Sequence, residues 1–231
     1  MTATIEPNAL AIDTSSDYLS LAVAREGITV ASYYERLGKR MAGEMFGVLD
    51  GLLQQAGIGL SDIDVIVAAR GPGSFTGTRL GLAMARTFAQ GQSCPLVGVD
   101  TLRLLAAQAE PEPGAIIHAA LNSIRDEVYH AAYRWDGEIL IEQAPVSVMA
   151  LEDLVTSAQG NPVVFRRFLP PKKDEPEFPP ELVSATLRHP HPDGALLLRE
   201  GLAMYANPGQ EGLPPAEPIY LKTEAFRKWK P

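Results

Sequence analysis

The chain has 231 residues, of which 46% are hydrophobic and 21% are charged, so it can bury a substantial core in one large or two small domains. Its formal net charge of −8 argues against a large electropositive platform for nucleic acids, and its single cysteine, Cys94, excludes an internal disulfide. An apolar run of about 18 residues and a signal-like N-terminus are both absent, so we expect a cytoplasmic protein that does not enter a membrane.

The first half of the chain predicts a three-stranded antiparallel meander followed by alternating helices and strands. Apolar runs separated by polar turns at 14–17 and 26–27 indicate the meander. Gly57 and Gly91 stand where two of the helices are expected to end. The expected strands are 10–13, 20–24, 28–33, 65–69 and 96–99, and the expected helices are 41–56, 78–90 and 101–109.

The second half predicts a weaker copy of this pattern after a Pro- and Glu-rich linker at 110–114. We therefore expect two lobes, 1–109 and 115–231, with a last helix near 193–205 packing between them. A stretch at 169–180 holds five prolines and predicts an exposed loop, and 227–230 forms a basic tail. The expected strands are 115–121, 127–133, 138–141 and 163–165, and the expected helix is 151–159.

A glycine-rich block at 71–81 follows an apolar run and opens a helical segment. A strand, a glycine turn and a helix N-terminus commonly form a cradle for a phosphate or another anion, because free N–H groups point out of the helix start. The spacing matches neither common nucleotide fingerprint, since the third glycine comes one residue late and Thr78 follows it without a lysine. The block therefore indicates a specific turn outside the two best-known classes of nucleotide-binding protein.

The duplicated lobe resembles the actin/hexokinase/Hsp70 superfamily, which implies an α/β fold of two lobes, each with a mixed sheet and flanking helices, the second lobe being reduced. Four motifs sharpen the resemblance to the TsaB/YeaZ family, in the order of that family: Ala11-Ile12-Asp13-Thr14-Ser15, the block 71–81, Glu127-Val128-Tyr129, and Glu217-Pro218-Ile219-Tyr220-Leu221. The resemblance implies a non-catalytic subunit in the formation of N6-threonylcarbamoyladenosine beside the tRNA anticodon. Its implied partners are the catalytic paralogue TsaD and the ATPase TsaE, which would carry the metal and the ATP, with tRNA contacted indirectly.

In the superfamily the first hairpin turn and the glycine turn hold nucleotide phosphates, which here nominates Asp13, Thr14, Gly71, Gly73, Ser74 and Gly77. The turn after Asp13 lacks a glycine that would let backbone approach a phosphate, and the matching position of the second lobe, Asn122, is not acidic. Asp13 as a plain turn residue is the alternative. The rival functions are an ATP- or sugar-phosphate-dependent enzyme and a glycoprotease-like hydrolase with Ser74 as nucleophile.

The sequence predicts no metal site and no catalytic residue. The catalytic paralogue holds its metal through two histidines four residues apart on a helix, and this chain has Met41 and Met45 there. Thioethers are poor ligands for the hard or borderline metals of such chemistry. The four histidines, at 118, 130, 189 and 191, include no pair on a plausible helical face.

Small residues at four-residue spacing mark a predicted helical surface. Gly43, Gly47 and Gly51 repeat along the helix 41–56, and each helical glycine costs about 1 kcal/mol relative to alanine. Either the two helices pack on each other and on their own sheet, or part of their apolar arc docks the catalytic paralogue or a second copy of this chain. Met45→Glu or Leu52→Glu is then expected to abolish the complex and leave the monomer folded. The expected interface residues are Met41, Gly43, Met45, Gly47, Val48, Leu52, Gly81, Met84, Ala85 and Phe88.

Overall fold

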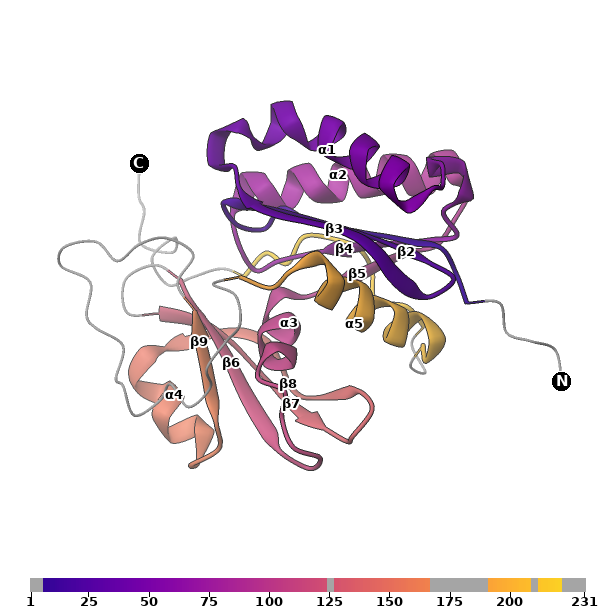
Figure 1. Ribbon diagram of the computed structural model, residues 1–231. Helices are drawn as coiled ribbons and strands as arrows, with labels where there is room; N and C mark the ends of the chain where they lie inside the picture. The colour runs from indigo at the N-terminus through magenta and orange to yellow at the C-terminus, as the bar shows by residue number, and fades with distance from the viewer. Residues whose placement is uncertain (1–5, 124–126, 167–190, 209–211, 222–231) are drawn as a thin grey trace, which may run out of the picture. The chain divides into compact units, whose positions relative to one another are not determined.

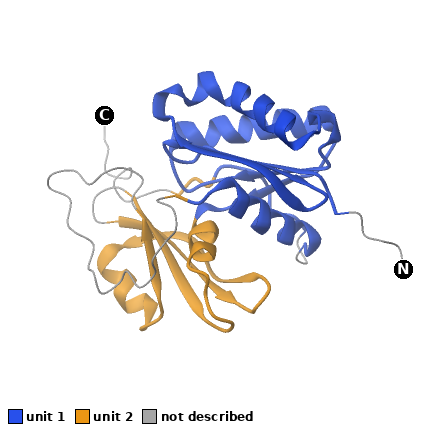
Figure 2. Cartoon of the chain, in the orientation of Figure 1, with its two compact units in different colours: residues 1–101, 192–218 blue, residues 102–191, 219–231 orange. Residues whose placement is uncertain are grey.

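The computed structural model describes residues 6–123, 127–166, 191–208 and 212–221. It divides the chain into two compact units (Figure 2): unit 1 is Met1–Thr101 with Pro192–Pro218, and unit 2 is Leu102–His191 with Ile219–Pro231. The last helix, expected in the second lobe, therefore lies in unit 1, whereas most of the helix expected at 101–109 lies in unit 2. The proline-rich loop at 169–180 and the basic tail at 227–230 lie outside the described residues.

Unit 1 is built on a five-stranded mixed sheet. Its strands are β1 (Ala9–Asp13), β2 (Tyr18–Arg25), β3 (Ile28–Arg36), β4 (Val65–Ala69) and β5 (Leu96–Val99), in the order β3-β2-β1-β4-β5. The first three pair antiparallel, while β4 and β5 run parallel to β1. The central strands β1 and β4 are buried along their whole length, as their unbroken apolar runs predict. The predicted meander is confirmed.

Helices cover both faces of this sheet (Figure 1). On one face α1 (Met41–Ala56) and α2 (Phe75–Gln92) lie side by side, and on the other lies α5 (Gly194–Ala206). Gly57 ends α1 in the left-handed region, as predicted. The prediction for α2 was wrong at both ends: Ser74 caps its start with a side-chain hydrogen bond, and Gly91 is helical, with Ser93 as the left-handed C-cap. Short 3-10 turns lie at Gly38–Arg40 and Leu60–Asp62.

A C-terminal segment completes the layer that contains α2. The Arg86 guanidinium of α2 donates to the carbonyl oxygen of Ala216 at 2.8 Å, and the Arg70 guanidinium donates to that of Pro215 at 3.4 Å. Gly98 of β5 has no side chain where the backbone of Ala216 passes, and an added Cβ would approach it at 2.9 Å. The segment leading into the Glu217–Leu221 motif is thus held by unit 1.

Unit 2 repeats the strand order of unit 1. Its sheet consists of β6 (Ile116–Asn122), β7 (Glu127–Trp135), β8 (Leu140–Ala150) and β9 (Val163–Arg166), in the order β8-β7-β6-β9. Its helices are α3 (Thr101–Gln108), which starts at the unit boundary, and α4 (Leu151–Ala158). The order of this second sheet matches β3-β2-β1-β4 of the first sheet. Within the described residues the second sheet has no counterpart of β5. The predicted α/β duplication with a reduced second lobe is confirmed.

No helix of the described part of the chain is long and apolar enough to cross a membrane.

Candidate functional site

The glycine turn leads directly into the capped start of α2. The Ser74 hydroxyl accepts a hydrogen bond from the Gly77 amide at 3.2 Å, which satisfies one of the free donors of the helix start. The Ser74 amide donates to the carbonyl oxygen of Ser15 at 2.6 Å. A carbonyl of the first hairpin turn therefore bonds to an amide that a phosphate would use.

The hairpin turn fits against the glycine turn and the start of α2 because both carry glycines at the points of contact. A Cβ added to Gly73 would lie closer than 3.0 Å to Ser15, and one added to Gly77 or Gly81 would lie closer than 3.0 Å to Thr14. Real Cβ atoms essentially never make such approaches. The Thr14 hydroxyl also donates to the Gly77 carbonyl at 2.7 Å. The hairpin turn is thus locked onto the first two turns of α2.

Asp13 serves as a turn residue in this arrangement. Its Oδ1 accepts from the Ser15 amide at 2.7 Å, two residues ahead, and the side chain is buried. Gly71, at the other end of the site, accepts from the Thr101 amide at 2.8 Å through its carbonyl. The six residues predicted to bind phosphate therefore lie close together. The hydrogen bonds described above join the hairpin turn to the glycine turn and the start of α2. In this structure the Ser74 amide, which a bound phosphate would use, is bonded to the hairpin carbonyl of Ser15.

The predicted docking residues divide into two groups, and the larger group lies in the core of unit 1. Met45 is 0% exposed and belongs to the packed core beneath α1 and α2. These side chains are buried because the broad apolar arc of α1 faces both its own sheet and α2. The buried residues are Met41, Met45, Leu52, Gly81, Met84 and Ala85.

The second group lies on the outer side of the two helices. A Cβ added to Gly43, Gly47 or Gly51 would meet nothing within 4 Å, so the glycine stripe of α1 does not serve packing within the chain. Phe46, missed by the sequence analysis, is 58% exposed, and its ring makes an edge contact with Phe88 of α2 at 6.4 Å. We call this the α1–α2 surface; it comprises Gly43, Phe46, Gly47, Val48, Gly51, Ala83, Thr87 and Phe88.

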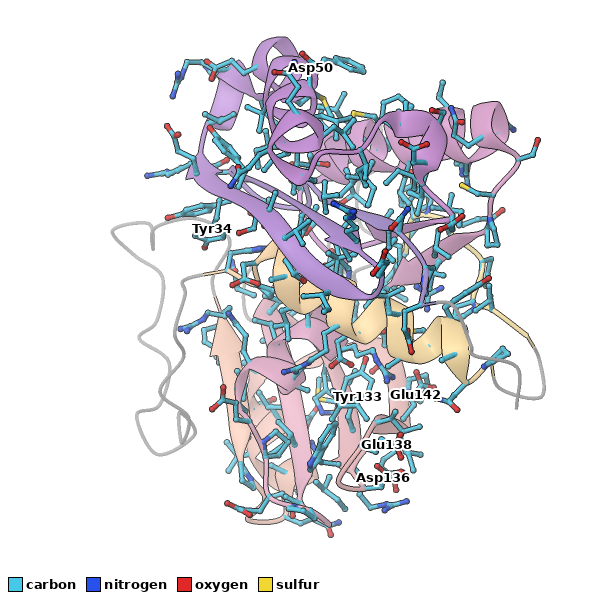
Figure 3. All side chains as sticks on the ribbon, turned by 45° about the vertical axis from the view of Figure 1, so that its right-hand side comes forward. Tyr34, Asp50, Tyr133, Asp136, Glu138 and Glu142 are labelled. Atoms are coloured by element: carbon cyan, nitrogen blue, oxygen red, sulfur yellow. The ribbon has the colours of Figure 1, made fainter. Side chains whose placement is uncertain are left out.

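Charge is distributed unevenly around the α1–α2 surface. Among the residues of α1 the charged side chains are acidic, Glu44 and Asp50, and Figure 3 labels Asp50 on the outside of this helix. Among the residues of α2 they are basic, Arg79 and Arg86. Arg79 stacks on the ring of the exposed Phe75 at 3.6 Å from its centroid. Glu44 is paired with Arg40 at the start of α1 at 2.8 Å, so the negative charge of α1 is partly neutralised there.

No group of three or more His, Cys, Asp or Glu residues that could hold a metal ion lies within the described ranges. Two histidines nevertheless meet in unit 2: His118 Nδ1 and His130 Nε2 lie 2.9 Å apart. The two histidines lie on neighbouring strands and not on one helix, so a helical spacing does not reveal them. Strands β6 and β7 pair Ala120 with His130, which places His130 diagonally across from His118. Alternation along two predicted adjacent strands could have revealed the pair.

The fold and the site define a duplicated α/β protein whose glycine turn is bonded to its own first hairpin and whose helix α1 carries an open glycine stripe. The family model "TsaD: tRNA N6-adenosine threonylcarbamoyltransferase" matches residues 35–181. Similar proteins include the tRNA threonylcarbamoyladenosine biosynthesis protein TsaB of Bacillus subtilis, 32% identical over 68% of this chain and 69% of that protein. TsaB of Escherichia coli is 35% identical over 56% of this chain, a match that spans only 58% of that protein.

Among solved structures, YeaZ from Pseudomonas aeruginosa is similar with a TM-score of 0.71 and 28% identity, over 93% of this chain and 100% of that one. The chain belongs to the TsaB/YeaZ family.

Proposed function

We propose that this chain is a non-catalytic subunit in the formation of threonylcarbamoyladenosine in tRNA, and that it binds the TsaD-type catalytic paralogue through the α1–α2 surface. Its membership of a family whose named relatives serve that modification supports the pathway. The observation that carries the proposal is the open glycine stripe at Gly43, Gly47 and Gly51, beside the exposed ring of Phe46.

The glycine stripe supports docking because it has no use inside the chain. Three exposed glycines in one helix cost stability, about 1 kcal/mol each relative to alanine, and no side chain or backbone of the described chain approaches them. Glycine lets a second helix come close to the α1 backbone, and an exposed aromatic ring at the edge supplies apolar area to bury. A partner that brings a helix across α1 would use both features.

The filled phosphate turn supports a role without nucleotide chemistry. The Ser15 carbonyl is bonded to the Ser74 amide, and opening the cradle would require Ser15 to leave Gly73 and Thr14 to leave Gly77 and Gly81. Within this proposal ATP and metal are held by the TsaD-type and TsaE-type partners, and tRNA is contacted through them. A second copy of this chain is the alternative occupant of the same surface, and the protein acts in the cytoplasm.

Reconstitution of the modification tests the proposal. The TsaD-type paralogue, the TsaE-type ATPase, an unmodified tRNA and the threonylcarbamoyl donor are combined with and without this chain, and the modified nucleoside is measured by mass spectrometry. We expect product only when the chain is present, and co-elution of the chain with the paralogue in size-exclusion chromatography.

Two results would contradict the proposal. Equal product with and without the chain would remove its role in the reaction. Tight binding of Mg-ATP to the isolated chain in calorimetric titration would instead support the rival enzyme, because it would show that the phosphate turn opens.

A further inference from the structure

The His118–His130 pair lies in a closed part of unit 2 that the proposed function does not use. His118 is 7% and His130 is 3% exposed, and their rings stack with centroids 5.1 Å apart. One imidazole donates to the other across 2.9 Å, which requires at least one ring nitrogen of the contact to carry no proton. The contact as it stands is therefore that of two neutral rings, or of one neutral and one charged ring.

The side of the sheet that holds the pair is apolar. Register places His118 beside Val163 of β9, and Ala120 lies between His130 of β7 and Phe165 of β9. Ala120, Val163 and Phe165 belong to the small core that Leu154 and Ala158 of α4 close. The backbone of His130 is tied to β8 by the Ser147 hydroxyl, which donates to the His130 carbonyl at 3.5 Å.

Few charged groups belong to the elements packed around the pair. The acidic residues of α4, Glu152 and Asp153, are exposed on the first turn of the helix, away from its buried side. Strand β9 faces the pair with Val163, and β8 pairs Ser147 with His130. Within the described residues no carboxylate is hydrogen-bonded to either ring, so a second positive charge would have no counter-ion at hand. Burial lowers the pKa of both imidazoles, and the charge of His118 lowers that of His130 further, to about 4.

We infer that the His118–His130 pair is an acid-sensitive latch: protonation of both rings breaks the contact and opens α4 and β9 from the sheet of unit 2. Two imidazolium rings at this distance would place two donors against each other in an apolar setting, which costs free energy on both counts. Because α4 contributes two buried residues, Leu154 and Ala158, it has little other packing to hold it. Unit 1 has no such pair among its described residues and keeps its sheet.

The sign of the pH dependence follows from the lowered pKa values. The unfolded chain binds protons near the ordinary histidine pKa of 6.5, whereas folded unit 2 resists them down to about pH 4 at His130. Folded unit 2 therefore keeps its full stability above pH 6.5 and loses stability as the pH falls from 6.5 toward 4. This linkage predicts that the opening equilibrium of unit 2 rises about ten- to a hundredfold between pH 7 and pH 4.5.

Hydrogen exchange on the full chain tests the latch. Amide protection, corrected for the intrinsic pH dependence of exchange, is measured at pH 7 and pH 4.5 for peptides from β6, β9 and α4 and, as an internal reference, from β1 and β4. We expect protection to fall about ten- to a hundredfold in the unit 2 peptides and to change far less in the unit 1 peptides.

Two variants separate the histidine pair from other acid effects. His118→Leu/His130→Leu replaces the pair by apolar side chains, so the fall in unit 2 protection should disappear while protection at pH 7 is kept. Asp153→Asn removes an exposed carboxylate at the start of α4 and should leave the fall unchanged. The latch is rejected if the double variant shows the wild-type fall, or if Asp153→Asn abolishes it. Should the double variant be poorly folded at pH 7, NMR titration of the two wild-type imidazoles decides, and a pKa near 6.5 for both would equally reject the latch.

Discussion

Gly47→Arg is expected to abolish association with the TsaD-type paralogue while raising the stability of the isolated chain. The site of residue 47 on α1 is open, so the arginine side chain meets nothing in the monomer. Arginine is a better helix former than glycine by up to about 1 kcal/mol, which should raise the free energy of unfolding by about that amount. A helix docked over the glycine stripe would meet the new side chain, and we expect affinity to fall at least about a hundredfold, or about 3 kcal/mol.

The measurement combines thermal unfolding of the variant with its binding to the paralogue in calorimetric titration. Ala42→Arg is the matched control: it adds the same side chain to an exposed position of the same helix, turned away from the glycine stripe, and should keep wild-type affinity. Unchanged affinity of Gly47→Arg would place the interface elsewhere. The opposite signs of the two effects matter, because a variant that merely damaged the fold would lose both stability and binding.

Met45→Glu and Leu52→Glu, the substitutions that the sequence suggests, are poor tests of docking because both residues are buried. Met45 and Leu52 lie in the core, so a glutamate at either position would place a charge under α1 and unfold unit 1. Loss of the complex in Met45→Glu would then report on folding and say nothing about docking.

Gly77→Ala is expected to destabilise unit 1 severely, by about 3 kcal/mol or more. The added Cβ would collide with the carbonyl oxygen of Thr14, a backbone atom fixed by the β1–β2 hairpin, which can move only if the hairpin leaves α2. The hydrogen bond from the Thr14 hydroxyl to the Gly77 carbonyl would be lost in the same movement. Chemical unfolding of the purified variant, followed by circular dichroism, gives the change in free energy.

Two further Gly→Ala variants make the comparison strict. At Gly81 the added Cβ meets the Thr14 side chain rather than backbone, so the cost should be smaller than at Gly77. At Gly43 it meets nothing, so alanine should stabilise α1 by up to about 1 kcal/mol. The same chemical change therefore ranges from strongly destabilising to stabilising. Equal effects at the three sites would contradict the hairpin lock.

The sequence predicted the architecture well where local pattern decides the outcome. The limits of α1 and β4 agree with the structure at both ends, because an apolar period and a following turn define them. The start of α2 was predicted three residues late, since only the structure shows Ser74 as the cap. In the second half, β8 is much longer than the 138–141 expected, because its pairing with β7 extends a segment with weak strand signals of its own.

The site was less predictable because its members depend on contacts distant in sequence. The six residues nominated for phosphate binding come from two separate segments, and the bond between the Ser15 carbonyl and the Ser74 amide depends on how closely these segments approach. Periodicity showed that α1 has a broad apolar arc, yet it could not tell that Met45 points into the core while Phe46 remains exposed. The His118–His130 contact depends on strand register, which a single sequence does not fix.

Unit 1 is formed by two separate stretches of the chain, so it cannot be completed during synthesis until unit 2 has been made. The strands of its sheet are complete by Val99, but α5, which covers one face, and the segment held by Arg86 follow only after unit 2 in the chain. While a ribosome synthesises residues 102–193, the sheet face that α5 will cover is therefore bare and rich in small apolar side chains such as Ala9, Ala11 and Val67. Gly201 later seats α5 against Val67 at a distance that no other residue at 201 would allow. Premature termination before α5 should therefore release a chain with an aggregation-prone sheet rather than an independent first domain.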